Sequence, residues 1–124
     1  MVGHDETLFA SIARVLDEQG CVAVVALDGF EAKKTLEGDW YFVGIIIDSR
    51  IRNPPSPTLV HYIKSETALK SIPVIVISAS WTSEESNKSI NAGAMALVPM
   101  DFTETQLQSV IGTVIGTKTK SVWD

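Results

Sequence analysis

Apolar residues recur along the chain in two patterns, one with helical spacing and one continuous. In the segment 6–19 the apolar side chains fall three or four residues apart, at Leu8, Ile12, Val15 and Leu16. Val43–Ile47 and Val74–Ile77 are unbroken apolar runs, which are typical of strands buried on both faces of a parallel sheet. The alternation of the two patterns predicts an α/β fold with three layers, helices covering both faces of a doubly wound parallel sheet.

Capping and turn residues predict where these elements begin and end. Proline after Ser56 and the Thr-x-x-Glu and Thr-x-x-Gln pairs at Thr82 and Thr103 are helix-start signals. The predicted helices are Glu6–Gln19, Phe30–Leu36, Ser56 to about Leu69, Thr82 to Asn91, and one that starts at Thr103. The predicted strands are Val22–Leu27, Val43–Ile47, Val74–Ile77 and Ala96–Val98, and residues 117–124 are expected to form a polar, frayed tail.

Composition narrows the class of protein without naming a function. The 124 residues are expected to form a single domain, 1–124, and the formal net charge of -5 argues against a nucleic-acid partner. The apolar runs are too short to span a membrane, and no segment is laid out like a signal peptide, so a cytoplasmic location is expected. The single Cys21 excludes an internal disulfide. The sequence contains no recognisable nucleophile–base pair, so an enzyme is not expected.

Reactive groups of a parallel sheet gather at the carboxyl ends of its strands. Asp48 follows one apolar run and Ser78 follows the other. The chemistry of the protein is therefore expected at these two residues and after Val98.

Three segments together resemble the receiver domains of bacterial response regulators: "ALDGFEAKKTLEGDWYFVGIIID", "IPVIVISAS" and "NAGAMALV". The resemblance spans roughly Val2 to Ile115 without insertions or deletions. It implies a flavodoxin-like (CheY-like) topology and a role in two-component phosphorelay signalling. In that family a histidine kinase phosphorylates a strand-end aspartate, an acidic pair holds Mg²⁺, and a hydroxyl residue and a lysine complete the site.

Carried over by position, the resemblance keeps only part of this chemistry. Asp48 matches the phosphoacceptor and Ser78 the hydroxyl residue. The remaining positions are degenerate: the acidic pair falls on Gly3 and His4, the aromatic switch on Leu97 and the lysine on Met100. Mg²⁺ prefers oxygen ligands, so glycine and a neutral imidazole make a poor site, and no cofactor is expected.

Two charged residues near Asp48 leave alternatives open. Arg50 is a candidate charge partner that either substitutes for the missing cation or locks Asp48 in an ion pair. A shift of register would offer Asp5 and Glu6 as the acidic pair, but it would shorten the first helix, so Asp5 with Asp48 is only a weak metal site.

The first strand of the family lies in the middle of the sheet, yet only Met1 and Val2 precede the positions of the acidic pair. A shortened or missing first strand is therefore expected, because strands usually have five or six residues. Unpaired backbone groups on its neighbours would be costly. Self-association or an altered strand arrangement is expected to compensate.

These observations predict an atypical (pseudo-)receiver domain that acts mainly by phosphorylation-independent binding of protein partners. Such partners are a histidine kinase or a downstream signalling protein. One alternative is a conventional receiver phosphorylated on Asp48 with Mg²⁺ as cofactor. The other is a flavodoxin-like module that binds a small ligand such as a flavin or cobalamin at the strand ends.

Overall fold

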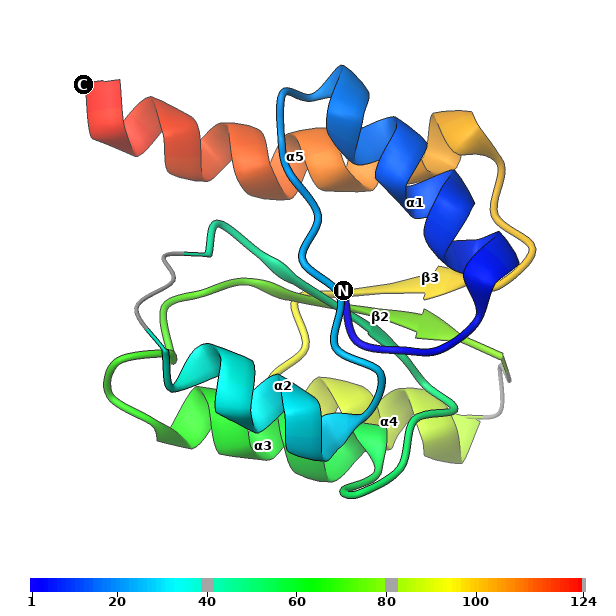
Figure 1. The fold of residues 1–124 in the computed structure, drawn as a ribbon, viewed down its shortest axis with the longest axis vertical. Helices are drawn as coiled ribbons and strands as arrows, with labels where there is room; N and C mark the ends of the chain where they lie inside the picture. Colours follow the sequence, from blue (N-terminus) through cyan, green and yellow to red (C-terminus); the bar gives the residue numbers. More distant parts are fainter. Residues whose placement is uncertain (39–41, 80–82, 124) are drawn as a thin grey trace.

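The computed structural model describes residues 1–38, 42–79 and 83–123, and its helices and strands alternate along the chain (Figure 1). The strands are β1 (Ile45–Asp48), β2 (Val74–Ser78) and β3 (Ala96–Pro99). The helices are α1 (Glu6–Glu18), α2 (Gly29–Leu36), α3 (Ser56–Ser65), α4 (Ser83–Ala92) and α5 (Glu104–Trp123).

The three strands form a parallel sheet in the order β1-β2-β3, and two short segments extend it beyond β1. Val2 forms parallel bridges to Ile47 on one side and to Ala26 on the other. The Val2 N–H donates to the Ile46 carbonyl at 2.8 Å, and the Ala26 N–H donates to the Met1 carbonyl at 2.9 Å. Met1–Gly3 therefore lies between β1 and the segment that contains Ala26, so the shortened first strand still joins its two neighbours.

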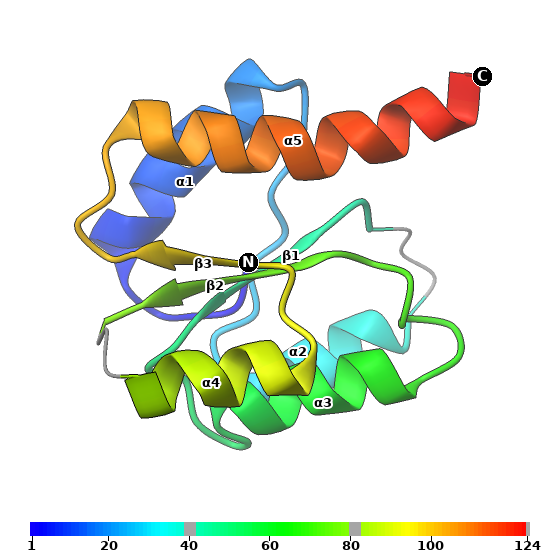
Figure 2. The same ribbon diagram turned by 180° about the vertical axis from the view of Figure 1, so that it is seen from behind.

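Helices cover both faces of this sheet, with α1 and α5 on one face and α2, α3 and α4 on the other (Figures 1 and 2). Alternate strand residues contribute side chains to two hydrophobic cores, one on each face of the sheet. Ile46, Ile75 and Ile77 pack with α1 and α5, whereas Ile45, Ile47, Val74 and Val76 pack with α2 and α3. Because strand side chains alternate between faces, Asp48 lies on the same side as Ile46, toward α1.

The predicted α/β class, the first helix and the two buried strands are confirmed. Helix α2 begins one residue early, at Gly29, because the Asp28 side chain accepts a hydrogen bond from the Glu31 N–H and caps it. The start signal at Thr82 lies outside the described residues. Among those residues, no helix is long and apolar enough to cross a bilayer.

Four predicted boundaries are wrong. Val22–Leu27 is not a regular strand, because only Ala26 has a bridging partner. Strand β1 starts at Ile45 rather than at Val43, which is 37% exposed. The third helix stops at Ser65 instead of near Leu69: Glu66 is extended, and the Lys64 ammonium donates to the Ile72 carbonyl at 2.7 Å. The expected polar tail continues α5 as far as Trp123, since no proline or glycine interrupts residues 117–123.

We expect Gly29→Ala to destabilise the fold by about 1–3 kcal/mol, because a methyl group there would overpack the start of α2. An added Cβ would clash with Pro54 Cδ and would lie 2.6 Å from Pro54 N. Gly112→Ala is the matched control: it lies in α5, and the nearest atom to its added Cβ is 3.8 Å away. It should be neutral or stabilise by up to about 1 kcal/mol. Urea unfolding measures both changes, and equal effects would contradict this account of α2.

Candidate functional site

Asp48 ends β1 with a buried carboxylate, its side chain only 4% exposed. The Asp48 N–H donates to the Val2 carbonyl at 3.0 Å, which fixes the end of the strand against the amino-terminal segment. A buried carboxylate is costly unless hydrogen bonds and an opposite charge compensate it. The surroundings of Asp48 must therefore supply both.

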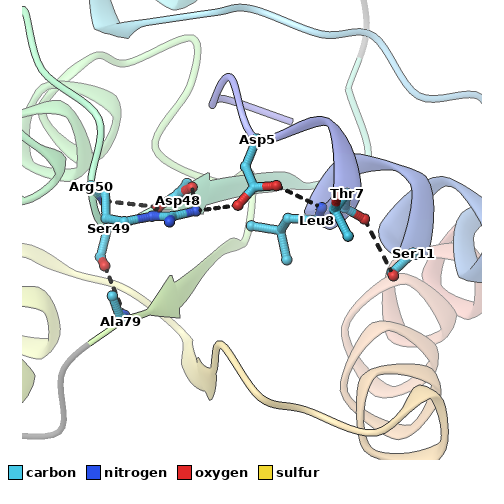
Figure 3. Close-up of polar contacts among 8 residues, drawn as sticks. All are labelled: Asp5, Thr7, Leu8, Ser11, Asp48, Ser49, Arg50 and Ala79. Atoms are coloured by element: carbon cyan, nitrogen blue, oxygen red, sulfur yellow. Dashed lines mark hydrogen bonds and ion pairs between the residues drawn. The ribbon is translucent and has the colours of Figure 1, made fainter.

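Arg50 supplies both (Figure 3). Its Nε donates to Asp48 Oδ1 at 3.0 Å and its Nη2 donates to Asp48 Oδ2 at 2.7 Å, so the guanidinium forks the two oxygens of one carboxylate. The Arg50 backbone N–H adds a third hydrogen bond to Oδ1 at 2.8 Å. This bidentate geometry is the strong form of an arginine–carboxylate pair. The hydrogen bonds with Asp48, followed by those with Asp5, raise the pKa of Arg50 above its usual value, so it stays charged.

Asp5 joins the same guanidinium from the start of α1. Arg50 Nη2 donates to Asp5 Oδ2 at 2.7 Å, while Asp5 Oδ1 accepts the Leu8 N–H at 3.0 Å and caps the helix. The hydrogen bond with Arg50 and that with Leu8 lower the pKa of Asp5 below its usual value. A single arginine thus connects the carboxyl end of β1 to the amino end of α1 (Figure 3).

The other predicted positions lie as follows. Gly3 is buried beside it: an added Cβ would lie 3.1 Å from Asp48 Cβ and 3.6 Å from its Oδ2. His4 is exposed. Ser78 is buried at the end of β2, and its carbonyl accepts the Met100 N–H at 3.0 Å. Leu97 and Met100 are half-buried, each against one of the two cores.

Sequence reasoning gave Arg50 as a partner of Asp48 but left Asp5 as a weak metal ligand. The structure brings Asp5 and Asp48 to the same nitrogen of Arg50. The sequence contains no signal that Asp5 and Asp48 share one arginine, because their proximity depends on the register of the sheet. Ser49, which was not predicted, also belongs to this edge: its hydroxyl accepts the Ala79 N–H at 3.0 Å.

The arrangement does not fit the divalent metal that the resemblance implies. Both oxygens of Asp48 are bonded to Arg50, and one oxygen of Asp5 is bonded to the same group. Gly3 offers no side-chain oxygen. Within the described parts of the chain, no three His, Cys, Asp or Glu side chains are grouped so that they could hold a metal. A cation beside Asp48 would have to displace the guanidinium.

We expect Arg50→Ala to reduce the free energy of unfolding by about 2 kcal/mol. The substitution leaves the Asp48 carboxylate buried without its cation, and the partial exposure of Arg50 moderates the loss. The double variant Asp48→Asn/Arg50→Ala should recover at least half of it. Arg52→Ala removes an exposed arginine two residues away and should change stability by less than about 0.5 kcal/mol. Equal losses for Arg50→Ala and Arg52→Ala in chemical unfolding would contradict the pairing.

The Asp5–Arg50 contact predicts an acid-dependent loss of stability. Because the pKa of Asp5 is lower in the folded than in the unfolded chain, its contribution is fully present above the unfolded value. That contribution is lost below about pH 4, as the pH falls through the folded pKa. Asp5→Asn should therefore flatten the stability profile in this range. Glu6→Gln, which removes the neighbouring carboxylate, is the control. An unchanged profile for Asp5→Asn in acid titrations of thermal unfolding would oppose the assignment.

The chain is similar to solved receiver domains over almost its whole length. The signal receiver domain of a histidine kinase from Syntrophus aciditrophicus matches with a TM-score of 0.84 and 21% identity, covering 94% of this chain and 87% of the other. A CheY-like receiver domain protein from Methanospirillum hungatei JF-1 gives 0.84 and 19%, covering 97% and 94%. The Mn²⁺-bound form of response regulator Rcp1 gives 0.78 and 16%, covering 90% and 88%.

Sequence comparison adds nothing to this likeness, since no family profile and no curated protein matches the chain. The likeness lies in the arrangement of the strands and helices. The chain has the CheY-like fold of response-regulator receiver domains.

Proposed function

We propose that this protein is an atypical receiver domain of two-component signalling that acts by binding protein partners without being phosphorylated. The observation that carries the proposal is the fork of Arg50 on both oxygens of Asp48. A phosphoacceptor aspartate must present an oxygen to the incoming phosphoryl group, and here each oxygen already accepts a charged hydrogen bond.

The groups that would stabilise a phosphoryl group in transit are also missing from their expected positions. Phosphoryl transfer depends on positioning and on positive charge around the moving group. Gly3 and Met100 carry no charge, and the nearby cation, Arg50, is bound to both Asp5 and Asp48. The residues at this edge of the sheet therefore favour a stable ion-pair network over turnover of a phosphoryl group.

Exposed apolar side chains support a role in protein binding. Ile90 on α4 is 51% exposed and Met95, just before β3, is 62% exposed. Aromatic and large apolar groups anchor most protein interfaces. Leu97 has no ring to rotate between two positions, which favours a surface that is presented constantly.

A conventional phosphoacceptor is the second candidate, favoured by one observation. Asp5 and Asp48 both reach Arg50 Nη2 at 2.7 Å, so two carboxylates lie together at the end of β1. The similar structure of Rcp1 binds Mn²⁺. Displacement of Arg50 would leave two carboxylates for such a cation. Binding of a flavin or cobalamin at the strand ends is less favoured: the cavity beside Asp5 and Met100 has a volume of about 220 Å³, below the usual range for ligand sites.

Incubation with acetyl phosphate separates the two candidates. We expect the intact mass of the protein to stay unchanged with or without Mg²⁺, because Arg50 occupies both Asp48 oxygens. Arg50→Ala and Arg52→Ala are compared under the same conditions, with Asp48→Asn as the blank. A Mg²⁺-dependent gain of one phosphoryl group by the wild type, abolished in Asp48→Asn, would overturn the proposal in favour of a conventional receiver.

A further inference from the structure

The segment Val22–Ala26 is the outer edge of the sheet, beyond Met1–Gly3 on the side away from β2 (Figures 1 and 2). Its inner side is bonded: Val24 and Ala26 carbonyls accept from Met1 and Gly3, and the Ala26 N–H donates to Met1. Successive residues of an extended chain point their backbone groups to opposite sides. Those of Ala23 and Val25 therefore point outward.

These outward groups are open. Within the described parts of the chain, the N–H and C=O groups of Ala23 and Val25 have no hydrogen-bond partner. The open stretch has defined ends, because the Cys21 N–H donates to the Leu16 carbonyl and the Leu27 N–H donates to Glu31 Oε2 at 3.1 Å. Two residues thus offer a pair of donors and a pair of acceptors to a further strand.

The side chains of this edge lack the usual protection against pairing. Natural edges carry lysine, proline or a covering element. No charged residue and no proline occurs between Gln19 and Leu27. Val22 is 91% exposed, Val25 40% and Leu27 54%. The edge is therefore uncharged, apolar and accessible.

We propose that a second copy of this chain pairs with this edge in antiparallel register, centred on Val24. The open groups favour this occupant: Ala23 and Val25 lie one residue on either side of Val24, so a second copy presents the same donors and acceptors in complementary order. The strip also carries no charged residue, so two copies of a chain with net charge -5 can meet there without like charges facing each other. Pairing about a two-fold axis sets Ala23 opposite Val25 of the other copy, and the reverse. All four outward donors in the two copies then find acceptors.

The register follows from the ends of the open stretch. A centre at Ala23 would place Val25 opposite Cys21, whose N–H is already bonded, and a centre at Val25 would place Ala23 opposite Leu27, whose N–H is bonded to Glu31. Only the centre at Val24 uses open groups alone. It also sets Asp28 opposite Gly20, so no acidic residue faces another. Because five residues a side are a small contact, the dimer is weak and depends on concentration.

Cross-linking of the full chain tests the register. In a Cys21→Ala background, Val24→Cys places the two thiols in directly opposed positions, about 4.5 Å apart between Cα atoms, within reach of a disulfide. Val22→Cys is the matched control, because the two copies of position 22 are separated by about 13 Å in this register. With a mild oxidant, Val24→Cys should form at least ten-fold more disulfide dimer, although Val22 is the more exposed position. The reverse ranking would overturn the proposal.

Sedimentation of the unoxidised protein tests the hydrogen bonds. Val25→Pro removes an outward N–H and leaves the inner bonds intact, so it should weaken dimerisation at least about ten-fold relative to Val25→Ala. A wild-type chain that stays monomeric up to millimolar concentration would overturn the proposal and leave the edge to a strand of another protein. If Val25→Pro does not fold, the cross-linking comparison decides. Neither experiment involves Asp48, so its result is independent of the proposed function.

Discussion

A buried carboxylate beside a sheet of aliphatic strands is the constraint on which this site depends. Asp48 is 3% exposed, and the three residues before it in β1 are isoleucines. Polar partners can therefore reach the carboxylate only at the end of the strand. Removing a carboxylate from water is tolerated only where charge and hydrogen bonds replace the lost solvation. Arg50 satisfies this need from two residues away, and in doing so its guanidinium reaches Asp5 at the cap of α1. The position of α1 and the chemistry of the strand end are thereby coupled.

The fold could be predicted from sequence wherever the information is local. The spacing of Ile12 and Val15 and the apolar run of β2 depend only on neighbouring residues, so the helical layer and the buried strands were predicted correctly. The end of α3 could not be predicted, because Leu69 continues the apolar period after the helix has stopped. The Lys64 ammonium donates to a carbonyl eight residues later, beyond the end of the helix, a contact that the local apolar pattern does not indicate.

In the candidate site, too, local contacts could be predicted and non-local ones could not. Arg50 could be predicted as a partner of Asp48 because only Ser49 separates them, whereas the part played by Asp5 depends on the register of Met1–Gly3 between β1 and Ala26. The missing strand also turned out to need few residues. Val2 bridges both neighbours. Its own N–H and carbonyl bond to β1, while Met1 and Gly3 bond to the segment that contains Ala26. A short central segment can thus hold a parallel sheet together when both helical layers cover it.

The closeness of Arg50 and Asp48 along the chain has a consequence for how the site responds to its surroundings. Two side chains with a single residue between them re-form their contact quickly after each separation, so the guanidinium acts as a tethered ligand of high effective concentration. A dissolved divalent cation must compete with this tether rather than with water. Changes in the concentration of magnesium would then leave the strand end unchanged.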